Sequence, residues 1–105
     1  MKGMTIAEKI LSAHCAKAVY ADDICFCTID KMMAHDANGP MAVRAFERMG
    51  GKTVCDPQKV FFIMDHACPA PYERVANLQK MLRDFAHKQN ITFYEGGEGV
   101  CHQLM

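Results

Sequence analysis

The sequence lacks any surplus of charge, because twelve Lys and Arg residues balance twelve Asp and Glu residues. A protein that binds nucleic acid by electrostatic attraction normally carries a basic surplus, so we expect no nucleic-acid partner. The sequence also lacks a long hydrophobic run behind Lys2. A secretory signal needs an apolar stretch of roughly 7–15 residues and a membrane span roughly 20. We therefore expect a cytoplasmic protein with no membrane partner.

A nucleotide-binding loop is missing as well. The glycine-rich segment at residues 95–99 is not followed by the Lys-Ser or Lys-Thr pair that completes a phosphate cradle. At 105 residues the chain can form one small domain, and we predict a single domain over residues 1–105. A glycine-rich loop that runs directly into the apolar residues 100–105 is what we expect where a domain has been cut.

The six cysteines have no export signal beside them. Reduced thiols that act as small hydrophobic side chains are therefore favoured over a disulfide framework. Cys25 and Cys27 would share one face of a strand, but zinc ligands usually come as a pair spaced two to four residues apart with a second pair elsewhere. The sequence has no second pair, so we expect no self-contained metal site. Disulfides and a thiol-ligated metal are the alternatives.

Hydrophobic periodicity predicts alternating helices and strands. Thr5 and Glu8 form a capping box at the start of the first helix. Helices are expected at residues 6–16, from Pro40 to the glycines at 50–51, and at 72–89, and strands at 24–29, 60–64 and 91–94. Such alternation is typical of an α/β fold. We predict a small three-layer α/β domain with a partly parallel sheet.

An acid and an imidazole, Asp65 and His66, follow directly after the most apolar predicted strand. In open parallel α/β sheets, ligands bind beyond the carboxyl ends of the strands. A carboxylate can orient an imidazole and favour its protonated form, which suits a general acid. The alternative is a turn-capping Asp beside a solvated His.

Two further pairs of residues could contribute to a functional site. His35 and Asp36 form a second acid–imidazole pair, although the residues alone favour a structural turn before a helix. Cys101 and His102 follow a loop with three glycines, which can let the backbone approach a ligand or can simply be flexible.

Four segments, taken in order, resemble the opening of large chains of the aconitase superfamily, closest to the branch of 3-isopropylmalate dehydratase and homoaconitase large subunits. Residues 5–11 are similar to T-x-x-E-K-I-L, 34–40 to A-[HN]-D-x-[TN]-x-P, 56–66 to D-P-x-K-h-h-h-x-x-D-H (h for apolar) and 99–103 to G-[IV]-x-H-Q. The resemblance covers nearly the whole chain and implies the N-terminal part of an aconitase-type domain.

The resemblance also implies a reaction. Members dehydrate and rehydrate a hydroxy-di- or tricarboxylic acid, here first of all 3-isopropylmalate in leucine biosynthesis. One iron of a 4Fe–4S cluster binds the substrate as a Lewis acid, and a distant serine removes a proton. His66 would protonate the departing hydroxyl, with Asp65 orienting it. His102 would line the pocket, and His35 and Asp36 would face the substrate.

The family's cluster cysteines and serine base lie beyond residue 105. The resemblance therefore implies a chain that is inactive alone, holds no cluster by itself, and works with further C-terminal domains or a small subunit. Apolar surface left open would favour self-association. Residues 68–71 differ from the more polar stretch of many members, so homoaconitase and dimethylmalate-type dehydratases stay open. So does a non-catalytic dicarboxylate-binding module.

Overall fold

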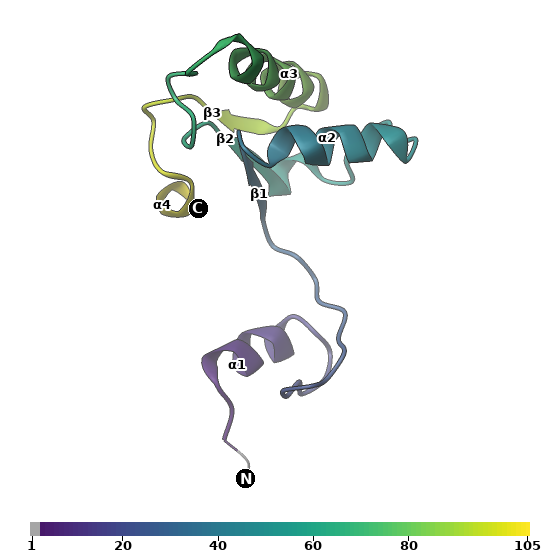
Figure 1. The fold of residues 1–105 in the computed structure, drawn as a ribbon. Helices are drawn as coiled ribbons and strands as arrows, with labels where there is room; N and C mark the ends of the chain where they lie inside the picture. Colours follow the sequence, from purple (N-terminus) through teal and green to yellow (C-terminus); the bar gives the residue numbers. More distant parts are fainter. Residues whose placement is uncertain (1–2) are drawn as a thin grey trace. The chain divides into compact units, whose positions relative to one another are not determined.

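A computed structural model describes residues 3–105, which fall into two compact units, one ending at Asp30 and one spanning Lys31–Met105 (Figure 1). The single domain expected over residues 1–105 stays a prediction. None of the described helices has the length and apolar character needed to cross a membrane.

The first unit contains helix α1, Ile6–Ala13. Its capping box is confirmed: Thr5 Oγ1 accepts from the Glu8 N–H at 3.2 Å, and a Glu8 carboxylate oxygen accepts from the Thr5 N–H at 2.7 Å. The helix ends before the predicted residue 16, because the chain turns back. The Ser12 hydroxyl then accepts from the Val19 N–H at 2.8 Å and fastens the returning segment to the helix.

The strand predicted at residues 24–29 is wrong, since this segment has no regular secondary structure. Ile24 and Phe26 are 86% and 93% exposed, whereas Cys25 and Cys27 are half-buried. The alternating pattern therefore does separate two faces. A strand also needs a neighbouring strand for its row of backbone N–H and C=O groups. Among the described residues, a hydrogen bond from the Thr28 N–H to the His14 carbonyl at 2.8 Å does not extend into such a pairing.

The second unit is a parallel three-stranded sheet with the order β1-β2-β3. Its strands are β1 Met32–His35, β2 Val60–Ile63 and β3 Thr92–Tyr94, connected by helices α2 Gly39–Arg48 and α3 Glu73–Gln89. A short 3-10 helix, Pro57–Lys59, leads into β2, and the one-turn helix α4, Cys101–Leu104, follows β3. The α/β class, helices α2 and α3, and strands β2 and β3 are confirmed. Strand β1 was missed, because its four residues lack the β-branched side chains that indicate a strand.

Both connecting helices lie on the same face of the sheet (Figure 1). The two crossovers step in one direction across the strand order, and right-handed crossovers of that kind place their helices on one side. The core between the layers consists of Val43, Phe62, Leu82, Ala86 and Ile91. This unit thus stacks two helices on one sheet face.

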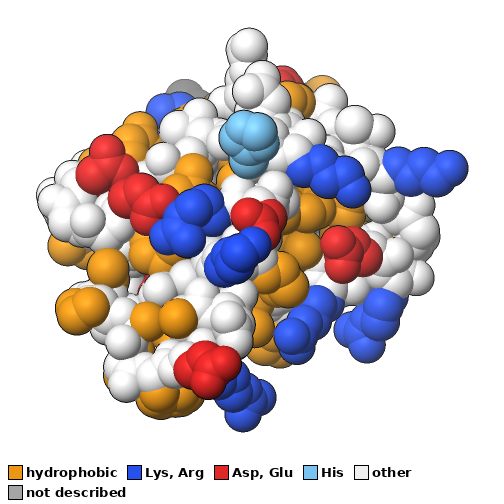
Figure 2. All heavy atoms as spheres, turned by 90° about the horizontal axis from the view of Figure 1, so that it is seen from above, with side chains coloured by type: hydrophobic (Ala, Val, Ile, Leu, Met, Phe, Trp, Pro, Cys, Tyr) orange, Lys and Arg blue, Asp and Glu red, His pale blue; other side chains and the backbone are white. Residues whose placement is uncertain are grey.

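The start of α2 packs closely on α3. A Cβ placed on Gly39 would lie 2.8 Å from the Leu82 side chain, so a larger residue there would force Leu82 to shift. The face of the molecule seen in Figure 2 carries basic and acidic side chains that are interspersed, in keeping with the balanced charge of the sequence.

Candidate active site at the carboxyl edge of the sheet

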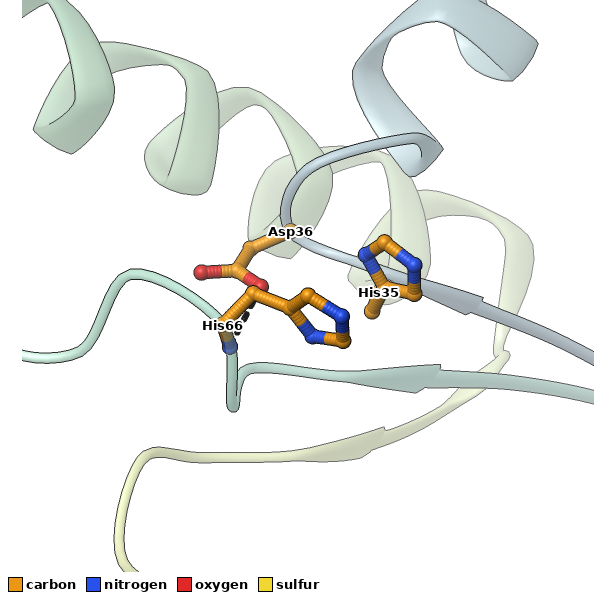
Figure 3. A group of neighbouring side chains, drawn as sticks. All are labelled: His35, Asp36 and His66. Atoms are coloured by element: carbon orange, nitrogen blue, oxygen red, sulfur yellow. Dashed lines mark hydrogen bonds between the residues drawn. The ribbon is translucent and has the colours of Figure 1, made fainter. Parts of the chain in front are cut away.

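The carboxyl ends of β1 and β2 bring the two acid–imidazole pairs together. His35, the last residue of β1, lies in register with Ile63, the last residue of β2. His66 follows three residues later, and its ring stacks on that of His35 with centroids 3.6 Å apart and planes 9° apart (Figure 3). The parallel register therefore joins two motifs that the sequence holds 31 residues apart.

Asp36 is buried, with 5% of its surface exposed. Its carboxylate accepts from the backbone N–H groups of His66 at 2.9 Å and Ala67 at 2.8 Å, and from Nε2 of Gln79 at 3.2 Å. Burial alone would raise the pKa of Asp36, but these donors lower it below its usual value. Asp36 does not cap α2, whose N-cap is Asn38.

Asp65 holds the ring of His66 and the start of α4 at once. One carboxylate oxygen lies 2.6 Å from Nδ1 of His66, and the other accepts from the Cys101 N–H at 2.7 Å. Burial would raise the pKa of Asp65, but the Cys101 and His66 hydrogen bonds lower it to about 2. Because Asp65 is then ionised near neutral pH, we assign the ring hydrogen to Nδ1 of His66, which leaves Nε2 for proton transfer.

His66 is also the accessible member of this pair. Its side chain is 45% exposed, whereas that of Asp65 is 7% exposed. An accessible imidazole held by a buried carboxylate is the arrangement that a general acid or base requires.

His102 joins the site through its neighbour. The Cys101 thiol is 1% exposed and lies 3.1 Å from Nδ1 of His102. Burial raises the pKa of the Cys101 thiol, and its hydrogen bond to Asp65 adds to that effect. The structure thus brings His35, Asp36, Asp65 and His66 into direct contact, and links His102 to them by way of Cys101.

Gln79 is the polar residue of this region that the sequence prediction missed. It is 7% exposed on α3 and donates from Nε2 to Asp36 and, at 2.6 Å, to the Ala67 carbonyl. It lies on the same helical stripe as the buried Leu82 and Ala86, three and seven residues later. A glutamine at a core position of a helix was the signal that could have revealed it.

The described residues can be tested as cluster ligands. The two groups whose three metal-ligating atoms lie within 4.8 Å of one another are His35, Asp36 and His66, and Asp65, His66 and Cys101. Iron–sulfur clusters are held by several Cys thiolates, and each group has at most one thiol. Neither group therefore fits a 4Fe–4S cluster. That the chain alone holds none stays a prediction.

Known proteins resemble this chain over nearly its whole length. Residues 8–105 match the aconitase family (aconitate hydratase). The chain is 43% identical over 103 residues to the 3-isopropylmalate dehydratase large subunit of Methanoregula boonei, and 42% identical over 104 residues to large subunit 1 of that enzyme from Methanopyrus kandleri. Each alignment covers 98% of this chain and 25% of the relative, so the chain spans about a quarter of the curated relatives that it matches. The chain belongs to the aconitase family.

Proposed function

We propose that this chain supplies the general acid and part of the substrate pocket of a hydro-lyase that acts on a hydroxy-di- or tricarboxylic acid, with 3-isopropylmalate as the first candidate. The observation that carries the proposal is the 2.6 Å contact between the buried Asp65 carboxylate and Nδ1 of the accessible His66 at the carboxyl edge of a parallel sheet. The names of the relatives support the substrate class.

His66 performs the acid step. With Nδ1–H held by Asp65, Nε2 of the protonated ring donates its proton to the hydroxyl as the C–O bond breaks, and water leaves. In the reverse direction the same nitrogen takes a proton from water as the C–O bond forms. The ionised Asp65 stabilises the positive charge of the protonated ring.

His35 binds the substrate in this proposal. Its Nδ1 accepts from the Ala37 N–H at 3.2 Å, so in the neutral ring the hydrogen lies on Nε2. That N–H can donate to a substrate carboxylate or hydroxyl oxygen, and the stack holds it beside His66. His102, next to Cys101, lines the same pocket.

The base and the iron–sulfur cluster come from other segments in this proposal, because each of the two candidate ligand groups among the described residues has at most one thiol. The relatives are large subunits about four times as long as the matched region, so we infer that the chain works with further segments and a small subunit. Strongly exposed Ile24 and Phe26 support such contacts or self-association. Alone, the chain has little activity.

The test combines this chain with the remaining three-quarters of a related large subunit and its small subunit, and follows formation of the unsaturated product by its absorbance. His66→Ala should lower kcat by about 10²–10⁴-fold, the usual contribution of a general acid. His87→Ala, an exposed histidine on α3, is the matched control and should not change the rate. Equal activity of the two variants would exclude His66 as the acid.

A non-catalytic dicarboxylate-binding module is distinguished by calorimetry on the chain alone. A module would release heat with 2-isopropylmalate and with 3-isopropylmalate and would give no turnover in the combined protein.

A further inference from the structure

We propose that Asp36 and Gln79 are positioning residues that hold the backbone of His66 and Ala67, and thereby hold the His66 ring against His35. The catalytic consequence rests on the proposed function of His66. Asp36 was expected to face the substrate, and Gln79 was not predicted to have any role.

These hydrogen bonds form a bracket around the backbone of residues 66–67. Asp36 Oδ1 accepts from the His66 N–H, and Oδ2 accepts from the Ala67 N–H. Gln79 Nε2 donates both to Asp36 Oδ2 and to the Ala67 carbonyl. Three backbone groups of residues 66–67, two N–H and one C=O, are thus held by Asp36 from the end of β1 and by Gln79 from α3. A segment gripped at both its N–H and C=O groups has little freedom to rotate.

Burial makes this bracket strong. Asp36 and Gln79 are 5% and 7% exposed, so water has little access to their side chains. A buried carboxylate is costly unless several donors satisfy it, and hydrogen bonds to an ionised group are about twice as strong as neutral ones. Every buried side-chain nitrogen or oxygen of the described residues has a partner. Both oxygens of Asp36 and Nε2 of Gln79 are therefore already engaged.

The bracket ties the two imidazoles to each other. Asp36 directly follows His35 in the chain, and its carboxylate binds the backbone of His66 (Figure 3). One residue therefore sets the spacing between the strand end that carries His35 and the turn that carries His66. If the bracket loosens, the 3.6 Å stack loses its alignment before the fold is lost.

The experiment compares Gln79→Met with Gln89→Met. Gln89 is a matched control on the same helix: it is also 7% exposed, accepts from the Val54 N–H at 3.1 Å and donates to the Lys52 carbonyl at 2.9 Å. Both changes remove buried hydrogen bonds of similar kind, but only Gln79 lies against Asp36 and Ala67. Asp36→Asn is a second variant, since an amide presents an N–H₂ group to one of the two backbone donors.

Amide hydrogen exchange in the 105-residue chain gives the first measurement. Gln79→Met and Asp36→Asn should speed exchange at His66 and Ala67 by about tenfold relative to Val54, and should remove the mutual ring-current shifts of the His35 and His66 protons. Gln89→Met should speed exchange at Val54 and leave the ring signals unchanged. Equal effects of the two glutamine changes at residues 66–67 would overturn the proposal.

The second measurement is turnover in the combined protein. Gln79→Met should lower kcat by about tenfold, because the rate of a proton transfer depends on the alignment of the donor and the acceptor. KM should change less than twofold. Gln89→Met should leave kcat unchanged. If no variant and no unsubstituted protein turns over, the proposed function fails, while the exchange data still decide the bracket. If the unsubstituted protein is active and Gln79→Met retains its kcat, the positioning role is excluded.

Discussion

The imidazole rings of His35 and His66 lie almost parallel, with 3.6 Å between their centroids. Each ring is held by a hydrogen bond of its own at Nδ1. Nδ1 of His35 accepts from the Ala37 N–H, and Nδ1 of His66 binds Asp65. The stack therefore leaves one nitrogen of each ring for chemistry, and its two members can be separated by substitution.

Replacing His35 should divide binding from alignment. His35→Phe keeps a flat ring against His66 but removes the N–H donor, so we expect KM to rise by about tenfold with a smaller change in kcat. His35→Ala also removes the stacking surface and should lower kcat as well. Steady-state kinetics of the combined protein check this. Identical KM and kcat changes in the two variants would contradict a role for the stack.

Replacing Asp65 should impair the acid without displacing it. In Asp65→Asn the amide cannot accept from both the Cys101 N–H and the His66 ring as the carboxylate does, so the ring loses its assigned tautomer. We expect kcat to fall by about 10²-fold or more. Asp84→Asn, an exposed carboxylate paired with Lys80 on α3, is the control and should retain full activity.

Asp65 should also make stability depend on pH in the acid range. Its pKa is about 2 in the folded chain against a usual 3.8, so its contribution is fully present above 3.8 and is lost as pH falls toward 2. Urea midpoints measured at pH 5, 4 and 3 should therefore fall less in Asp65→Asn than in the unsubstituted chain. The hydrogen bonds of Asp36 lower its pKa too. Asp36 therefore also makes stability fall as the pH falls, and it does so in both proteins. Parallel curves for the two proteins would refute the assignment to Asp65.

Gly39→Ala should destabilise the second unit. The added Cβ would lie 2.8 Å from the side chain of Leu82, a residue of α3 that is buried in the core. Such overpacking costs about 1–3 kcal/mol. Gly3→Ala, where nothing lies within 4 Å of the added atom, should change the free energy of unfolding by less than about 0.5 kcal/mol. Urea unfolding followed by circular dichroism gives both values.

The thiols should differ in reactivity. Cys101 is buried and its pKa is raised, first by burial and then by Asp65, whereas Cys55 and Cys68 are exposed. Because the thiolate is the reactive form, iodoacetamide should modify Cys55 and Cys68 well before Cys101. Mass spectrometry of timed samples measures the order. In Asp65→Ala, where the carboxylate is gone, Cys101 should react sooner; unchanged protection would show that Asp65 does not contribute to it.

Local features of the fold followed from local signals. The Thr5–Glu8 capping box, the apolar run of β2 and the stripe of α3 depend on side chains a few residues apart, and the structure confirms each of them. The strand predicted around Phe26 failed for a non-local reason, since its alternation was real but no strand among the described residues pairs with it. Strand β1 was missed because its partner β2 defines it more than its own residues do.

The sequence by itself determined the family, the α/β class and the identity of the candidate site residues, because these depend on residue types in a linear order. Only the tertiary structure decided that both helices lie on one face, since that follows from the order of strands in the sheet. It alone placed His35 on His66 and directed Asp36 and Gln79 to the backbone of residues 66–67. Those relations depend on parallel pairing between strands that are distant in the chain, and hydrophobic periodicity carries no information about such pairing.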